Sequence, residues 1–154
     1  MTGGTVEAIH VAPASGQSVE ARDTVEAVSG RGLREDRHFR EPETEPRPPG
    51  SGQDLTLIES EALAAVARDF DVELEAGEHR RNLTTRGVAL NHLVDERFRV
   101  GEVVCQGVEL CEPCRHLEGL TEDGMIQALV HRGGLRADIL EGGTVAVGDG
   151  VREL

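Results

Sequence analysis

The sequence contains no lysine, tryptophan or tyrosine, and its only aromatic residue, phenylalanine, occurs three times. It also lacks a long apolar run, because the longest stretch, 62–67, is far shorter than the roughly 20 residues of a membrane span. The first ten positions have neither the basic nor the apolar region of a signal peptide. We therefore expect a cytoplasmic location and no membrane partner.

Several sequence motifs that define large enzyme classes are missing as well. There is no G-x-S-x-G elbow, no P-loop, no dinucleotide-binding G-x-G-x-x-G and no H-E-x-x-H helix. Serine hydrolase, kinase and zinc protease activities therefore have no support. The 154 residues also show no repeat array and no heptad pattern, which predicts one globular domain over 1–154.

The charge of the chain is strongly one-sided. Asp and Glu total 29 against 16 basic residues, all arginine, and the net charge is −13. A field of this sign repels phosphate backbones and anionic lipid, so we expect no nucleic acid partner. The acid excess is typical of halophilic proteins, in which counterions screen the self-repulsion, but a GC-rich genome that favours arginine codons explains the arginines equally well. A chain that proves most stable without KCl would exclude the halophilic interpretation.

Short apolar segments and frequent glycine turns indicate the fold class. Extended segments are expected at 5–11, 18–28, 55–58, 83–90, 98–100 and 102–110, the last with a bulge at Gly107. Apolar residues form one stripe over 59–70, which predicts a helix, and a second helix is expected at 122–130. Strands and helices do not alternate regularly. The predicted class is therefore α+β, a β-rich, barrel-like single domain with two or three short helices.

Two further local features follow from the turn residues. Residues 135–140 and 144–147 are expected to pair as a hairpin across 141–143. The segment 41–53, EPETEPRPPGSGQ, holds four of the six prolines and no aliphatic residue, so we expect a mobile surface loop there.

Three cysteines, Cys105, Cys111 and Cys114, lie within ten positions. An odd number in a chain without a signal peptide argues against a disulfide framework. Cys114 is followed by Arg115 and His116, two donors that favour the thiolate if they point at the sulfur. A thiolate is both a nucleophile and a soft-metal ligand. Cys105, inside a predicted strand, is expected to be a buried small hydrophobe.

The C-x-x-C spacing of Cys111 and Cys114 leaves other chemistries open. A dithiol redox centre usually opens a helix of a βαβ unit, a pattern that this chain lacks. A zinc site completed by Cys105 and His116 would lack the second, separated ligand pair of structural zinc sites, so no zinc is expected. A third interpretation is that Cys114 is simply buried and structural.

Clusters of basic and polar residues are candidates for an anion site. Arginines that gather in a pocket bind phosphate or carboxylate through two parallel hydrogen bonds, although each one can instead pair with a surface carboxylate. The glycines 133–134 would let the backbone approach a ligand, or would end a helix. The clusters are Arg80 to Asn82, Asp36 to His38, and Arg132 with Arg136.

Segments along nearly the whole chain, in order, resemble the MOSC domain family, which is named for the C-terminal domain of molybdenum cofactor sulfurases. They are residues 32–38 (GLREDRH), 55–58 with Glu61, 80–83 (RRNL), 87–88 with 98–101, 112–114 (EPC), 132–137 (RGGLRA) and 147–149 (VGD). One residue departs from the pattern, because Glu35 stands where the family usually has glycine. A carboxylate there is expected to alter the turn and weakens the inference that this loop contacts an anion.

The resemblance implies a barrel of the MOSC or pyruvate-kinase β-barrel type in a short standalone member. It implies that Cys114 is the functional thiol, which carries sulfur as a persulfide or ligates the molybdenum of a pterin cofactor. Reduction of N-hydroxylated compounds and a family-level association with pyridoxal phosphate follow from the same resemblance. The scarce aromatic residues leave the stacking platform of a pterin ring unassigned.

The resemblance also gives the basic clusters a role. Arg80, Arg81, Arg132 and Arg136 would bind the anionic part of the cofactor, and Asn82, Asp36, His38 and His116 would orient it or tune the thiol. The implied partners are the anionic pterin cofactor or a small sulfur-bearing ligand, with a protein that donates sulfur or electrons. Two alternatives stay open: a non-catalytic module that binds an anionic ligand, and a C-x-x-C dithiol oxidoreductase.

Overall fold

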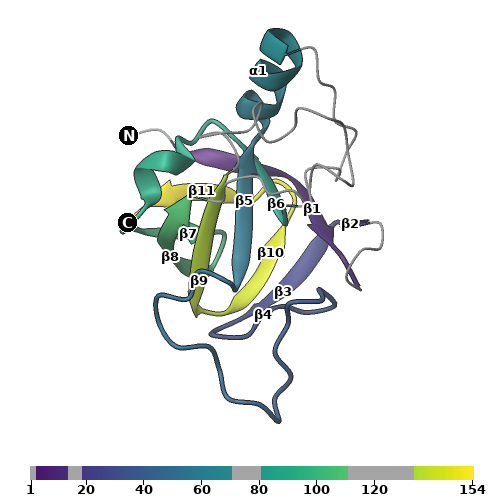
Figure 1. The fold of residues 1–154 in the computed structure, drawn as a ribbon, viewed down its shortest axis with the longest axis vertical. Coiled ribbons are helices and arrows are strands. Elements are labelled where there is room, and N and C mark those ends of the chain that lie inside the picture. The colour runs from purple at the N-terminus through teal and green to yellow at the C-terminus, as the bar shows by residue number, and fades with distance from the viewer. Residues whose placement is uncertain (1–2, 14–18, 71–80, 111–133) are drawn as a thin grey trace.

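The computed structural model describes residues 3–13, 19–70, 81–110 and 134–154, and its centre is a closed β-barrel (Figure 1). Seven strands form the ring in the order β1–β11–β7–β8–β9–β5–β6, which closes because β6 and β11 both pair with β1. The barrel strands are β1 (Gly4–Val11), β5 (Leu55–Glu59), β6 (Leu83–Arg86), β7 (Arg97–Val100), β8 (Val103–Leu110), β9 (Leu135–Glu141) and β11 (Gly150–Glu153). All neighbours in the ring are antiparallel except β5 and β6.

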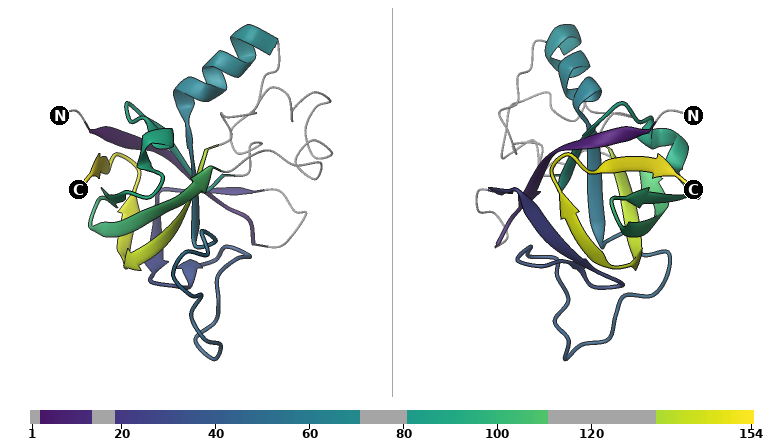
Figure 2. Two further views of the ribbon diagram at one scale, coloured as in Figure 1. Left: turned by 60° about the vertical axis from the view of Figure 1, so that its left-hand side comes forward. Right: turned by 180° about the vertical axis from the view of Figure 1, so that it is seen from behind.

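The remaining elements surround this ring (Figure 2). Strand β2 (Glu20–Arg22) extends the barrel sheet by pairing with β1. Strands β10 (Gly143–Ala146), β3 (Thr24–Val28) and β4 (Gly32–Leu33) form a second sheet in that order. Helix α1 (Ser60–Phe70) follows β5, and a 3₁₀ turn covers Leu90–Leu93. No helix among the described residues is long and apolar enough to cross a membrane.

Alternation along the strands fills the barrel with aliphatic side chains, as expected for a sheet with one face on the core. In β9, Leu135, Ala137 and Ile139 belong to the core cluster, whereas Arg136 between them is only half-buried. The cluster also contains Val145 of β10, so the two sheets share one core. Each fully buried aliphatic side chain contributes roughly 2 kcal/mol of transfer free energy.

The β-rich, barrel-like single domain is therefore confirmed, with one α-helix and one 3₁₀ turn among the described residues. The second predicted helix, 122–130, lies outside those residues. The first helix begins one residue later than predicted, because Glu59 stays in β5 opposite Thr85. The predicted extended segment 83–90 ends at Arg86 and is followed by the 3₁₀ turn.

The predicted hairpin of residues 135–147 is wrong. Strands β9 and β10 follow each other in sequence, but β9 pairs with β5 and β8, whereas β10 pairs with β3. The backbone of Gly142 packs so closely on β3 that a Cβ there would lie 2.5 Å from the Ala27 carbonyl oxygen. The glycine pair therefore transfers the chain from one sheet to the other instead of closing a hairpin.

The predicted bulge at Gly107 is confirmed. The register of β8 on β9 shifts between Gly107 and Glu109. A Cβ at Gly107 would lie 1.9 Å from the carbonyl oxygen of Leu93. Glycine is required there because the 3₁₀ turn packs directly on the strand backbone.

Candidate functional site

The strand ends that carry the sequence motifs are neighbours in the sheet. The register aligns five residues across five strands: Leu110 of β8, Leu135 of β9, Leu57 of β5, Leu83 of β6 and Ile9 of β1. We call these residues the inner row, because all but Leu110 belong to the core cluster. Leu110 directly precedes the cysteine segment, Leu135 follows Arg132, and Leu83 follows Arg80. The strands β8, β9, β5 and β6, which precede or follow these motifs in the sequence, are consecutive in the barrel (Figure 2).

The side chains at the centre of the hypothesis lie outside the described residues. They are Arg80, Cys111, Cys114, His116 and Arg132. Their convergence on one point therefore stays a prediction. The described candidates are Arg81, Asn82, Arg136, Asp36 and His38.

Asn82 connects the start of β6 to β5 and β1 through hydrogen bonds. Its Oδ1 accepts hydrogen bonds from the backbone N–H and the hydroxyl of Thr56, both at 3.1 Å. Its Nδ2 donates to the carbonyl oxygen of His10 at 3.2 Å, and its backbone N–H donates to Thr56 Oγ1 at 3.0 Å. The amide thereby fixes the start of β6 against β1 and β5, directly after Arg81, of which only 8% is exposed.

The contacts of Asn82 belong to a polar row on the outside of the barrel. Thr56 is the register partner of Arg136 on β9, and Arg136 is the partner of Glu109 on β8. We call His10, Asn82, Thr56, Arg136 and Glu109 the outer row. Within the described part of the chain, no carboxylate lies within 4 Å of the Arg136 guanidinium, whereas the guanidinium of Arg86 is paired with Glu7 at 2.9 Å. Among the described residues, Arg136 therefore differs from Arg86 in having no carboxylate partner for its guanidinium.

His10 is a feature of this region that the sequence analysis missed. It is 5% exposed, and burial lowers its pKa from the ordinary 6.5. The imidazole is therefore neutral near neutral pH. A single histidine in a strand gives no sequence signal, because only the register shows that it lies beside Asn82.

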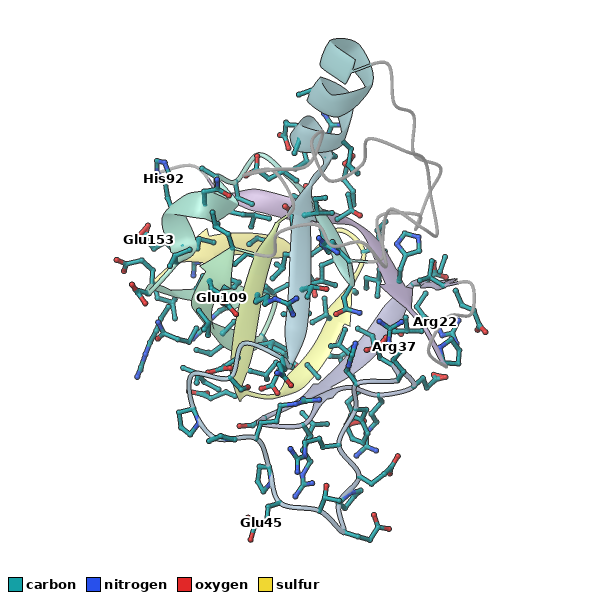
Figure 3. All side chains as sticks on the ribbon, viewed as in Figure 1. Arg22, Arg37, Glu45, His92, Glu109 and Glu153 are labelled. Carbon is teal, nitrogen blue, oxygen red and sulfur yellow. The ribbon has the colours of Figure 1, made fainter. Side chains whose placement is uncertain are left out.

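The segment around Asp36 is fastened to the end of β1. Asp36 Oδ1 accepts the backbone N–H of Ala12 at 2.9 Å, and its Oδ2 accepts the N–H of His38 at 3.3 Å. The N–H of Arg37 donates to the Ala12 carbonyl at 2.8 Å. Figure 3 shows Arg37 on the side of the barrel formed by β1 and β3. Asp36 therefore holds this loop next to the outer row.

His38 is placed in a basic environment by this loop. Arg37 Nε donates to His38 Nε2 at 3.2 Å, a hydrogen bond that this nitrogen accepts in the neutral form of the imidazole. Desolvation is the main cause that lowers the pKa of His38, and the charges of Arg37, Arg47 and Arg136 lower it further, against the charge of Asp36. Two predicted site residues, His38 and Arg136, are thus close enough to interact electrostatically.

Glu35 adopts the backbone geometry that glycine normally supplies. Its φ is +72°, in the left-handed region that glycine enters readily but L-residues other than Asn and Asp enter rarely. Glu35 Oε1 also lies 3.6 Å from the guanidinium of Arg22. The left-handed turn that a glycine would favour is therefore present, and Glu35 occupies it at a cost in strain.

Cys105 is a core residue, as predicted. It is fully buried, and burial, with smaller contributions from the charges of Asp54 and Asp138, raises the pKa of its thiol to about 12. A thiol of this kind is unreactive at neutral pH. The described residues contain no group of three or more His, Cys, Asp or Glu side chains that could hold a metal ion.

Gly134 has a packing role in the described structure, and the predictions of a ligand contact or a helix end at 133–134 stay predictions, because residue 133 and those before it lie outside the described residues. Its φ is +106°, and a Cβ there would lie 1.9 Å from the carbonyl oxygen of Leu57. Glycine at this position therefore lets β9 begin directly against β5.

Together, the closed barrel and the polar residues at its strand ends define a small β-barrel domain whose candidate functional residues lie in the loops between strands. A family model described as MOSC domain matches residues 34–152, so the chain belongs to the MOSC domain family. No curated protein matches the chain.

Solved structures share the fold. The YUAD protein from Bacillus subtilis superposes with a TM-score of 0.80 at 15% identity, covering 97% of this chain and 94% of its own. YiiM from Escherichia coli gives a TM-score of 0.70 at 18% identity over 100% and 70% of the two chains. YiiM from Geobacillus stearothermophilus gives 0.70 at 12% identity over 98% and 75%. At these identities the likeness establishes the fold alone.

Proposed function

We propose that this protein handles molybdenum cofactor or a sulfur atom through Cys114. Membership of the MOSC domain family, which is linked to molybdenum cofactor sulfurase-like proteins, supports this proposal. The observation that carries it is the inner row, because the register joins the strands next to Cys114, Arg132 and Arg80.

The donor set fits the anionic part of such a cofactor. Arg80, Arg81, Arg132 and Arg136 would bind its phosphate, since guanidinium groups match phosphate geometry. Arg136, which no described carboxylate neutralises, is the clearest of these. The bound cofactor would supply the redox chemistry of molybdenum, and Cys114 would supply a soft thiolate ligand.

The remaining candidates act around this group. Asn82 and Asp36 hold the strand start and the loop in place, as their hydrogen bonds indicate. His38 and His116 would donate hydrogen bonds or tune the thiol. Phe98 is fully buried in the core, and Phe39 lies under Arg34 with the guanidinium carbon 5.2 Å from its ring centre. Burial leaves no face of Phe98 open to a pterin ring, and Arg34 covers one face of Phe39.

Two chemistries are compatible with a thiol of this kind. In the first, Cys114 ligates molybdenum in an enzyme that reduces N-hydroxylated compounds. In the second, the Cys114 thiolate attacks the outer sulfur of a donor persulfide, forms a new S–S bond and releases the donor thiolate. The protein then carries that sulfur as a cysteine persulfide.

Metal analysis of protein from a cofactor-producing host separates these chemistries. Wild type, Cys114→Ser and the matched control Cys111→Ser are compared for molybdenum per chain. Near-stoichiometric metal in wild type and Cys111→Ser, and none in Cys114→Ser, supports the ligand role. Cyanide-releasable sulfur that depends on Cys114 supports the carrier role. Absence of both, after loading with a sulfur donor, would overturn the proposal.

A further inference from the structure

Residues 47–53, which we call the strap, connect the loop that carries His38 to the outer face of β9. The guanidinium of Arg47 pairs with Asp54 at 2.9 Å, and the two side chains are only 8% and 2% exposed. The same guanidinium donates to the carbonyl oxygens of His38 and Arg31. Asp54 in turn accepts the backbone N–H of Ile139 in β9 at 2.9 Å. One buried ion pair thus links the His38 loop to the barrel.

A second buried carboxylate holds the other part of the strap. Asp138 on β9 is 5% exposed, and its Oδ2 accepts the N–H of Gly50 at 2.7 Å. Its Oδ1 accepts the N–H of Gly52 at 2.8 Å and lies 3.4 Å from the Ser51 hydroxyl. Hydrogen bonds to a charged, buried carboxylate are the stronger kind. Both carboxylate oxygens are therefore committed to the strap backbone.

These contacts bring the strap against the base of Arg136. A Cβ added to Gly52 would lie 3.3 Å from the Cβ of Arg136 and 3.2 Å from that of Val108. The strap backbone therefore limits where the long Arg136 side chain can go. A guanidinium that is restricted before its ligand arrives loses less freedom on binding.

We propose that the strap orients His38 and Arg136 for anion binding. The positioning residues are Arg47 in the strap and the two carboxylates that hold it, Asp54 and Asp138. The anion-binding part of this statement rests on the proposed function, whereas the orientation of His38 does not. Mobility of the whole 41–53 segment stays a prediction, but the strap half of it has defined contacts with the barrel.

The test replaces Asp138 by Asn, which can accept at only one atom. Amide exchange at Gly50 and Gly52 should become at least about tenfold faster. The pKa of His38, followed by NMR, should rise towards its ordinary value, because a loosened strap exposes the imidazole to water and lets Arg47 and Arg136 move away. The dissociation constant for inorganic phosphate, the probe, should rise about tenfold, which corresponds to the loss of one good contact.

A second variant and a control make the result independent of stability. Arg47→Lys keeps a charge beside Asp54 but loses the forked donation to His38, so it should shift the His38 pKa in the same direction with the fold intact. Glu153→Gln makes the same carboxylate-to-amide change away from the strap and Arg37, beside the C-terminus (Figure 3), and should change nothing.

The outcomes separate the two claims. If amide exchange becomes faster in Asp138→Asn but the His38 pKa and the phosphate affinity stay as in wild type, the strap has only a structural role and the inference is overturned. If wild type does not bind phosphate but both variants raise the His38 pKa, anion binding fails and the positioning of His38 stands. If Asp138→Asn does not fold, the His38 pKa and the phosphate affinity of Arg47→Lys decide.

Discussion

The inner and outer rows lie on the same barrel strands but use opposite chemistry. The inner row is aliphatic, and all of its residues except Leu110 pack into the core. The outer row consists of polar residues. The side-chain amide of Asn82 forms hydrogen bonds with Thr56 on β5 and with His10 on β1. The comparison shows that aliphatic packing fills the barrel, whereas specific side-chain hydrogen bonds fix the start of β6 against its neighbours on the outside.

The largest effect on stability is expected from a substitution in the inner row. Leu57→Ala should lower the free energy of unfolding by about 3 kcal/mol, because it leaves a cavity in the core. Urea unfolding measures the change, and Val147→Ala, at a position that is 45% exposed, serves as the control. A loss below about 0.5 kcal/mol in Leu57→Ala would contradict the assignment of Leu57 to the core.

The matching change in the outer row is Asn82→Ala. It should cost about 2 kcal/mol, since it leaves a Thr56 N–H and a His10 carbonyl without their partner. Its effect should also appear as faster amide exchange at the start of β6. Gln53→Ala, an exposed amide outside the row, should have no effect. If Asn82→Ala is as stable as Gln53→Ala, the hydrogen bonds of Asn82 contribute nothing to the stability of the fold.

A smaller effect depends on pH. Burial lowers the pKa of His10 below its ordinary 6.5, so the unfolded chain binds more protons than the folded one in the window below 6.5. The contribution of His10 to stability therefore rises with pH through that window and is constant above it. His10→Gln should flatten the slope of unfolding free energy against pH below 6.5. An unchanged slope would show that His10 titrates as in the unfolded chain.

The smallest expected effect concerns Glu35. Glu35→Gly should relieve the left-handed strain and gain about 0.5 kcal/mol, after the greater freedom of glycine in the unfolded chain is subtracted. Glu45→Gly, made in the exposed loop at 41–45 (Figure 3), should not stabilise the protein. A stability loss in Glu35→Gly would mean that the contact of Glu35 with Arg22 outweighs the backbone strain.

Much of the fold could be predicted from the sequence, because alternation and glycine turns are local signals. Strand β5, helix α1 and the bulge at Gly107 were anticipated on that basis. The pairing of β9 and β10 was not, because the two glycines between them resemble a hairpin turn. Only the packing of Gly142 on β3 shows that the chain changes sheet there.

The candidate site was predictable in its residue types but not in its contacts. The R-R-N and D-R-H segments pointed to Asn82 and Asp36 as residues that orient a ligand. The register of β1, β5 and β6 places the partners of Asn82, and the packing of the loop on the end of β1 places those of Asp36; no local sequence pattern contains either contact. The strap contacts of Arg47 were missed for the same reason, since a proline-rich segment carries no signal for a buried ion pair.

The most direct test of the central claim measures the reactivity of Cys114 with iodoacetamide across pH, in a Cys111→Ser background. Cys105 does not interfere, because it is buried and its thiol pKa is about 12. If the arginine segments converge on Cys114, its apparent pKa lies below the roughly 8.5 of a free cysteine and rises in Arg81→Gln. Reaction only above that value, with no change in Arg81→Gln, would contradict the account.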